Sequence, residues 1–180
     1  YLIPSFPLLI WAVEDVIELE IKKNQKLNEK YPNIKHDFLL KHGLQYFKSL
    51  LPTASLIESN LFYYVNNERC ETDGLIIYDK VLFIIEAKGH RITKKAKAGH
   101  ELKTQDHLKD IVRDSYAQGI RTLKHLEENK IAEFKTKDGK KIEITREDYD
   151  DIIIVSLTLE PIGNLTMAIK ATNEIGYFND

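Results

Sequence analysis

The sequence predicts an α/β fold in which a central mixed sheet is flanked by helices. Three observations support this class. Apolar residues recur at helical spacing near the N-terminus and again between about residues 105 and 129. Stretches rich in β-branched and aromatic residues follow one another between residues 61 and 87. The short apolar run from Ile152 to Val155 is typical of a strand covered on both faces.

Two helices are expected before the first strand. From about Leu9 to Lys30 apolar residues are three or four positions apart, and we expect Tyr31-Pro32 to end this helix, because a proline disfavours helical backbone in the residue before it. A second helix is expected over residues 37–51. We therefore divide the 180-residue chain into an N-terminal helical extension, residues 1–35, and an α/β domain, residues 36–180.

The later elements follow in an order typical of a mixed sheet. Strands are expected at residues 61–65, 71–78 and 81–87, followed by a long helix over residues 105–129. The pair Asp138-Gly139 lies between alternating runs and predicts a β-hairpin, which we interpret as a surface insertion. The apolar run within residues 151–159 is expected to be a strand inside the sheet, and residues 165–171 could form a further strand.

Composition and charge exclude several classes of protein. The chain is 43% hydrophobic and 30% charged, and no apolar run approaches the roughly 20 residues that a membrane helix needs. Cys70 is the only cysteine, which excludes an internal disulfide and a multi-cysteine zinc site and favours a cytoplasmic location. The formal net charge is -2, so binding of nucleic acid would require a local basic patch.

The hairpin at residues 71–88 holds the candidate site. A two-residue turn at positions 79 and 80 would set Asp73 opposite Glu86 and, by alternation along the strands, on the same side as Lys88. Opposed carboxylates repel each other, and burial of a charge is costly without a partner. A divalent cation held by Asp73, Glu86 and the main-chain carbonyl of Ala87 would compensate them, because Mg²⁺ prefers oxygen ligands.

Lys88 would lie beside such a cation and a scissile phosphate. There it could polarise the attacking water and stabilise the charge that builds up on phosphorus. Glu71 has two interpretations, an ion pair with Lys88 or a role of its own in the site. The Glu-x-Lys spacing alone is also compatible with an ordinary ion pair at the end of an exposed strand, so the full arrangement carries the hypothesis.

An acid near the start of one strand, Asp73, followed by Glu86-Ala87-Lys88 at the end of the next, resembles the PD-(D/E)XK nuclease superfamily. The segments from Glu71 to Asp79 and from Val81 to Lys88 are most similar to its nuclease-related (NERD-like) branch. The resemblance covers about residues 38–159. It implies a restriction-endonuclease-like core, αβββαβ, with an extra N-terminal helix and an inserted β-hairpin.

The resemblance also implies an activity and its residues. It identifies Asp73, Glu86 and Lys88 as catalytic, adds Gln118 from the following helix, and implies Mg²⁺ or Mn²⁺ as the cofactor. Two positions depart from the family pattern. Thr72 stands where a proline is usual, and the helix before the strands has no acid, so that His42 or Gln45 would have to replace it.

A basic stretch directly after Lys88 predicts how the substrate is held. At the mouth of the site its cations would contact phosphates without sequence preference. The residues concerned are Arg91, Lys94, Lys95, Lys97 and Lys103.

We therefore expect a metal-dependent nuclease that acts above all on DNA. The alternatives are a catalytically degenerate domain that binds nucleic acid or a protein partner, and a structural module within a larger enzyme. The expected partners are nucleic acid, further domains of a longer chain, since residue 1 is not methionine, and a second copy in a homodimer. A membrane partner is not expected.

Overall fold

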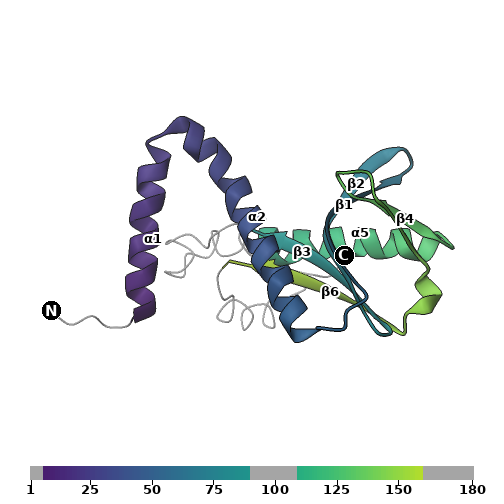
Figure 1. The fold of residues 1–180 in the computed structure, drawn as a ribbon. Helices are drawn as coiled ribbons and strands as arrows, with labels where there is room; N and C mark the ends of the chain where they lie inside the picture. Colours follow the sequence, from purple (N-terminus) through teal and green to yellow (C-terminus); the bar gives the residue numbers. More distant parts are fainter. Residues whose placement is uncertain (1–5, 90–108, 160–180) are drawn as a thin grey trace, which may run out of the picture.

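The structure is a computed structural model that describes residues 6–89 and 109–159, and it has a mixed sheet with helices on both faces (Figure 1). In chain order the elements are α1 (Phe6–Lys22), α2 (Gln25–Leu50), β1 (Leu56–Val65), β2 (Glu68–Tyr78), β3 (Val81–Lys88), the π-helical turn η1 (Lys109–Arg113), α5 (Asp114–Glu128), β4 (Ala132–Lys135), β5 (Lys141–Ile144), the 3-10 turn η2 (Arg146–Asp148) and β6 (Asp151–Thr158). The general α/β class predicted from the sequence is confirmed.

The strands form one six-stranded sheet in the order β5-β4-β1-β2-β3-β6. The hairpin predicted around Asp138-Gly139 is present as β4 and β5, but its interpretation as a surface insertion was wrong. β4 pairs with β1, and the side chains of Phe134, Ile142 and Ile144 are buried in the main core. The alternation that predicts the hairpin also gives it an apolar side, which is buried when the hairpin extends the sheet.

The strand β6 lies at an edge of the described sheet, not inside it as expected. It pairs in parallel with β3, from Val81↔Asp151 to Lys88↔Thr158. Its apolar run is explained by cover on both faces, because Ile154 packs against one core and Val155 against the other. The further strand suggested at residues 165–171 lies outside the described residues.

The helices before the sheet differ from the predicted ones. α1 ends at Lys22, and Asn24 caps α2 by accepting a hydrogen bond from the Leu27 main-chain N–H, at 3.2 Å. The predicted break at Tyr31-Pro32 is therefore wrong, since Pro32 lies within α2. Proline cannot donate the main-chain hydrogen bond that a helix residue normally makes. The packing of α2 against the sheet, where Leu40 is buried, offsets the cost of losing it. The proposed boundary between residues 35 and 36 falls within this continuous helix.

α2 and α5 cover opposite faces of the sheet. On one face, Leu40 of α2 packs in a core with Ile76 of β2 and with Ile85 and Ala87 of β3. Under α5, Leu126 packs among buried residues of β1, β2 and β3. α5 comes especially close to β6 at Gly119, where an added Cβ would lie 2.4 Å from Ile154 Cγ2. This contact fixes the height of α5 above the sheet and thereby of the side chains that it directs toward β3.

α1 contacts α2 and extends away from the sheet (Figure 1). An ion pair between Lys35 Nζ and Glu18 Oε1, at 3.3 Å, joins the two helices. Although α1 is rich in apolar residues, none of the helices in the described part of the chain combines the length and apolar character needed to cross a membrane.

The hairpin β2–β3 has the predicted register. Tyr78 pairs with Val81 across a turn in which Asp79 has a φ of 52°, and the pairing continues to Gly74↔Ile85. The next position in this register brings Asp73 to Glu86. However, the regular alternation of side chains between the two faces of the sheet breaks before it reaches Asp73.

Both β1 and β2 change phase at one pair of positions. Leu61 and Cys70 contribute to the core under α5, and so does Leu75, although strict alternation from Cys70 would direct Leu75 to the other face. The register of the pair stays constant across this point but omits Asn60 and Asp73, and Asn60 has a left-handed φ of 54°. A left-handed residue turns the strand locally. Asp73 therefore faces α2, where His36 contacts it, whereas Lys88 bonds to Gln118 on α5. The prediction that Asp73 shares one side of the hairpin with Leu75 and Lys88 was wrong.

Candidate active site

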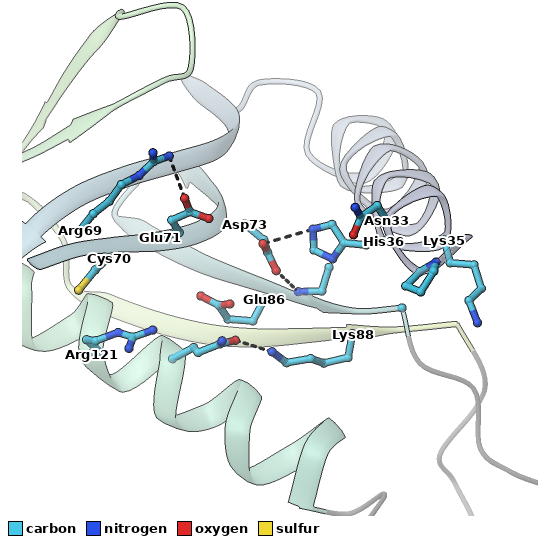
Figure 2. Close-up of a pocket in the computed structure, with 14 residues that line it drawn as sticks. Asn33, Lys35, His36, Arg69, Cys70, Glu71, Asp73, Glu86, Lys88 and Arg121 are labelled. Atoms are coloured by element: carbon cyan, nitrogen blue, oxygen red, sulfur yellow. Dashed lines mark hydrogen bonds and ion pairs between the residues drawn. The ribbon is translucent and has the colours of Figure 1, made fainter. Parts of the chain in front are cut away.

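A cavity of about 580 Å³ opens where β2 and β3 approach α2 and α5 (Figure 2). All the residues predicted from the hairpin and the following helix line it: Asp73, Glu86, Ala87, Lys88 and Gln118. The structure therefore brings these five residues together. The predicted basic residues Arg91, Lys94, Lys95, Lys97 and Lys103 lie outside the described residues.

Glu86 is a buried carboxylate, with 2% of its surface exposed. Its Oε1 accepts a hydrogen bond from Thr72 Oγ1 at 3.2 Å. Burial, and secondly the negative charge of Asp73, raise the pKa of Glu86 to about 8, while the Thr72 hydrogen bond and the charge of Lys88 oppose the shift. In the described part of the chain no cation forms an ion pair with this carboxylate, so its ionised form is poorly compensated.

Asp73 faces α2 and the main chain of β3. Its Oδ2 accepts a hydrogen bond from the Ala87 N–H at 2.6 Å, and its Oδ1 lies 3.4 Å from His36 Nε2. Figure 2 shows the Asp73 carboxylate directed toward His36, and Asp73 and Glu86 both line the cavity. The change of strand phase thus turns Asp73 toward α2 while leaving both carboxylates on the cavity.

Lys88 is held by the residue predicted on the following helix. Its Nζ donates a hydrogen bond to Gln118 Oε1, which links the end of β3 to α5. The alternative of an ion pair between Glu71 and Lys88 is not formed, because Glu71 pairs with Arg69 at 2.8 Å. In the described structure the side-chain partner of Lys88 is therefore a neutral amide and not a carboxylate.

His36 is a cavity residue that the sequence prediction missed. The predicted helix began at position 37, which left His36 in a loop, whereas α2 places it over Asp73. Close packing brings the helix there, since an added Cβ at Gly89 would lie 2.9 Å from the main-chain nitrogen of His36. The suggested substitutes for the missing acid do not line the cavity. His42 packs against Phe38 in a tilted arrangement with ring centroids 4.2 Å apart, and Gln45 lines a different cavity.

Arg121 is a second residue that the sequence prediction missed. It lies three positions after Gln118 on α5, lines the same cavity, and its charge favours the ionised form of Glu86. Residues three apart on a helix share a face, so the spacing from Gln118 was the signal that could have identified it.

The donor set suits a hard divalent cation with few protein ligands. In residues 6–89 and 109–159 no group of three or more histidine, cysteine, aspartate or glutamate side chains is arranged to hold a metal. Two carboxylates remain, Asp73 and Glu86, with the carbonyl of Ala87 close by in sequence. Mg²⁺ is commonly bound by one or two carboxylates while it keeps several waters, so the poorly compensated Glu86 fits such an ion.

The contact of His36 with Asp73 should make stability depend on pH. The hydrogen bond to Asp73 is the largest cause that raises the pKa of His36, and partial burial opposes it. The stabilisation is therefore complete below the unfolded pKa of about 6.5 and is lost as pH rises through the higher folded value. Without metal, we expect His36→Gln to lower the free energy of unfolding by roughly 0.5–1 kcal/mol at acidic pH and by less at alkaline pH.

Urea denaturation of both proteins on each side of neutrality would measure this difference. His42→Gln is the matched control, because His42 is exposed on the same helix and does not contact Asp73. If His36→Gln lowers the free energy of unfolding equally at acidic and alkaline pH, the contact between His36 and Asp73 is not an ion pair.

Comparisons of the chain with models of protein families, with curated proteins and with solved structures gave no match.

Proposed function

We propose that this chain is a metal-dependent nuclease of the PD-(D/E)XK type that hydrolyses phosphodiester bonds, above all in DNA. The observation that carries the proposal is the buried, poorly compensated carboxylate of Glu86 on a cavity shared with Asp73 and Lys88. A structural ion pair would have given Glu86 a cationic partner. Instead, Lys88 bonds to Gln118, which leaves the Glu86 carboxylate without an ion-pair partner among the described residues.

Each residue has a separate task in this proposal. Asp73, Glu86 and the carbonyl of Ala87 hold Mg²⁺ or Mn²⁺, which when bound supplies a Lewis acid for the phosphate and lowers the pKa of water. Lys88 presents its ammonium group to the charge that develops on the phosphate. Gln118 positions the Lys88 side chain through their hydrogen bond. Asp73 is itself oriented by the Ala87 N–H.

The proposal is tested by incubating the purified chain with labelled single- and double-stranded DNA in Mg²⁺, in Mn²⁺ and in chelator. We expect cleavage with either cation and none in chelator. Matching RNA substrates test the preference for DNA, and circular DNA separates internal cutting from cutting at an end. A protein that cuts none of these substrates with any divalent ion would not be a nuclease.

The second candidate is a catalytically degenerate domain that binds nucleic acid or a protein partner. One observation favours it: in the described structure α2 contributes His36 to the cavity, where related nucleases often have a further acid. The same experiment separates the two candidates. Retention of DNA without cleavage, in chelator and in divalent ions alike, would support the degenerate domain.

A further inference from the structure

A second cavity, of about 540 Å³, continues along α2 from the candidate active site. Its walls come from α2, from β1 and from the β4–β5 turn. His36 lines the first cavity and Asp37, the next residue, lines the second. Asn60 of β1 also lines the second cavity. The register of β1 and β2 places Asn60 opposite Asp73, which lines the first cavity. The two cavities are therefore neighbours along both the helix and the strands.

Three lysines from separate parts of the fold line this second cavity. Lys41 and Lys48 lie on α2, and Lys137 reaches it from the β4–β5 turn, where its Nζ lies 3.4 Å from Asn60 Oδ1. Asp37 is the one acid in the lining. We refer to Lys41, Lys48 and Lys137, with the cavity between them, as the lysine groove.

The lysines of the groove are distinguished by their place, because three of them line one cavity. Elsewhere on the described surface some lysines form ion pairs, whereas others, such as Lys80, Lys124 and Lys130, are isolated cations that form none with a described carboxylate. Within the described residues, none of the three groove lysines has a carboxylate partner. Three cations around one cavity, with Asp37 as the single acid among its described lining residues, repel one another, and this arrangement becomes favourable when an anion binds between them.

We propose that the lysine groove binds the phosphate backbone of a nucleic-acid strand whose continuation enters the candidate active site. This inference rests on the proposed nuclease function. From Asn33 to Lys48, α2 rises about 22 Å, and a duplex strand carries one phosphate per about 3.4 Å of axis. The helix is therefore long enough to lie beside several successive phosphates of one strand.

The polar residues of the groove support nucleic acid as the occupant. Gln45, Ser59 and Asn60 offer amide and hydroxyl groups between the lysines, and such groups commonly contact phosphate oxygens. Contacts of this kind depend on the charge and geometry of the phosphate backbone and not on the bases, so we expect little preference for base sequence. This places the binding surface on α2 and the β4–β5 turn, in addition to the basic segment predicted after Lys88.

The test measures binding in chelator, where cleavage is not required. We compare the wild type, the groove variant Lys41→Gln/Lys48→Gln/Lys137→Gln, and a control with the same change in charge, Lys80→Gln/Lys124→Gln/Lys130→Gln, whose lysines lie away from the groove. Labelled DNA is titrated at several salt concentrations. For the groove variant we expect a salt slope smaller in magnitude by about 2 for single strands or 3 for duplex, and therefore roughly a hundredfold weaker binding or more at about 0.1 M salt, with little difference near 1 M.

Unchanged affinity and salt slope in the groove variant would overturn the inference, as would an equal loss in the control. Displacement of DNA by polyglutamate at equal concentration of charge would also overturn it, because the groove would then accept any acidic chain. Equal melting temperatures of the three proteins establish that folding is intact.

A small diester separates this inference from the proposed function. Bis(4-nitrophenyl) phosphate is too short to reach the groove from the active site, so the wild type and the groove variant should hydrolyse it at equal rates. If neither protein hydrolyses the diester or DNA, the nuclease proposal fails. The binding comparison in chelator still tests whether the lysine groove binds DNA. If the diester is cleaved and the groove variant binds DNA like the wild type, the groove inference alone fails.

Discussion

Lys88→Ala should cleave DNA roughly 10² to 10³ times more slowly than the wild type, since this is the usual loss when one charge-stabilising group leaves an active site. Affinity for divalent ions should hold or rise slightly, because a positive neighbour of the carboxylates disappears. Affinity for uncut DNA should change little, because one cation among several phosphate contacts contributes modestly.

The decisive measurement determines cleavage rate, Mn²⁺ affinity and DNA affinity for the same preparations. Gln118→Ala should show a smaller loss of rate, because Lys88 keeps its charge but loses the hydrogen bond that positions it. Lys124→Ala, an exposed change on α5, serves as the control. A Lys88→Ala protein that cuts as fast as the wild type would remove Lys88 from the mechanism.

Glu86→Gln should have two large and opposite effects. It should abolish cleavage and the stabilisation by divalent ions, because one of two carboxylate ligands is lost. In chelator at alkaline pH it should be more stable than the wild type. The amide can still accept the hydrogen bond from Thr72, but it does not have to ionise in a buried position.

The pH range follows from the raised pKa of Glu86, about 8 against an ordinary value of 4.5. Between these values the folded wild type holds a proton that the unfolded chain releases, so its stability falls as pH rises through this range. One pKa unit corresponds to about 1.4 kcal/mol, so the loss is of the order of 3–5 kcal/mol. Glu86→Gln lacks this group and should not show the loss.

Chemical denaturation at pH 5, 7 and 9, with Mg²⁺ and with chelator, would measure both effects. The difference in unfolding free energy between wild type and variant should be small at the lowest pH and largest at the highest. Glu127→Gln, at an exposed position of α5, is the matched control. If the two stability profiles run parallel, Glu86 does not titrate as its burial requires.

The sequence predicted the part of the site that depends on local patterns. A two-residue turn fixes the register of β2 and β3, so the neighbourhood of Asp73 and Glu86 followed from counting. Lys88 and Gln118 meet because the long helix returns across the end of β3. The register needs only the turn and strand pairing, whereas Gln118 was identified through the resemblance to the nuclease superfamily and not from a local pattern.

The errors arise where tertiary contacts override local patterns. Pro32 was expected to end a helix, but the capping of α2 by Asn24 and its packing on the sheet keep it helical, and this brings His36 to the site. The apolar run of β6 was expected to mean a central strand, whereas an edge strand that is only partly covered on its two faces carries the same pattern. The turn of Asp73 toward α2 depends on Asn60, which no alternating pattern marks.

The paired change of phase at Asn60 and Asp73 restricts how this protein can change by insertion or deletion. Loss of Asn60 alone would shift the outer half of β1 by one residue against β2 and so disrupt the pairing from Leu61↔Thr72 to Val65↔Glu68. A compensating deletion must remove a residue from β2 at the same point, which is Asp73 itself. Lineages that straighten these two strands would therefore lose the carboxylate in the same step, whereas lineages that keep Asp73 must also keep an irregular residue beside it.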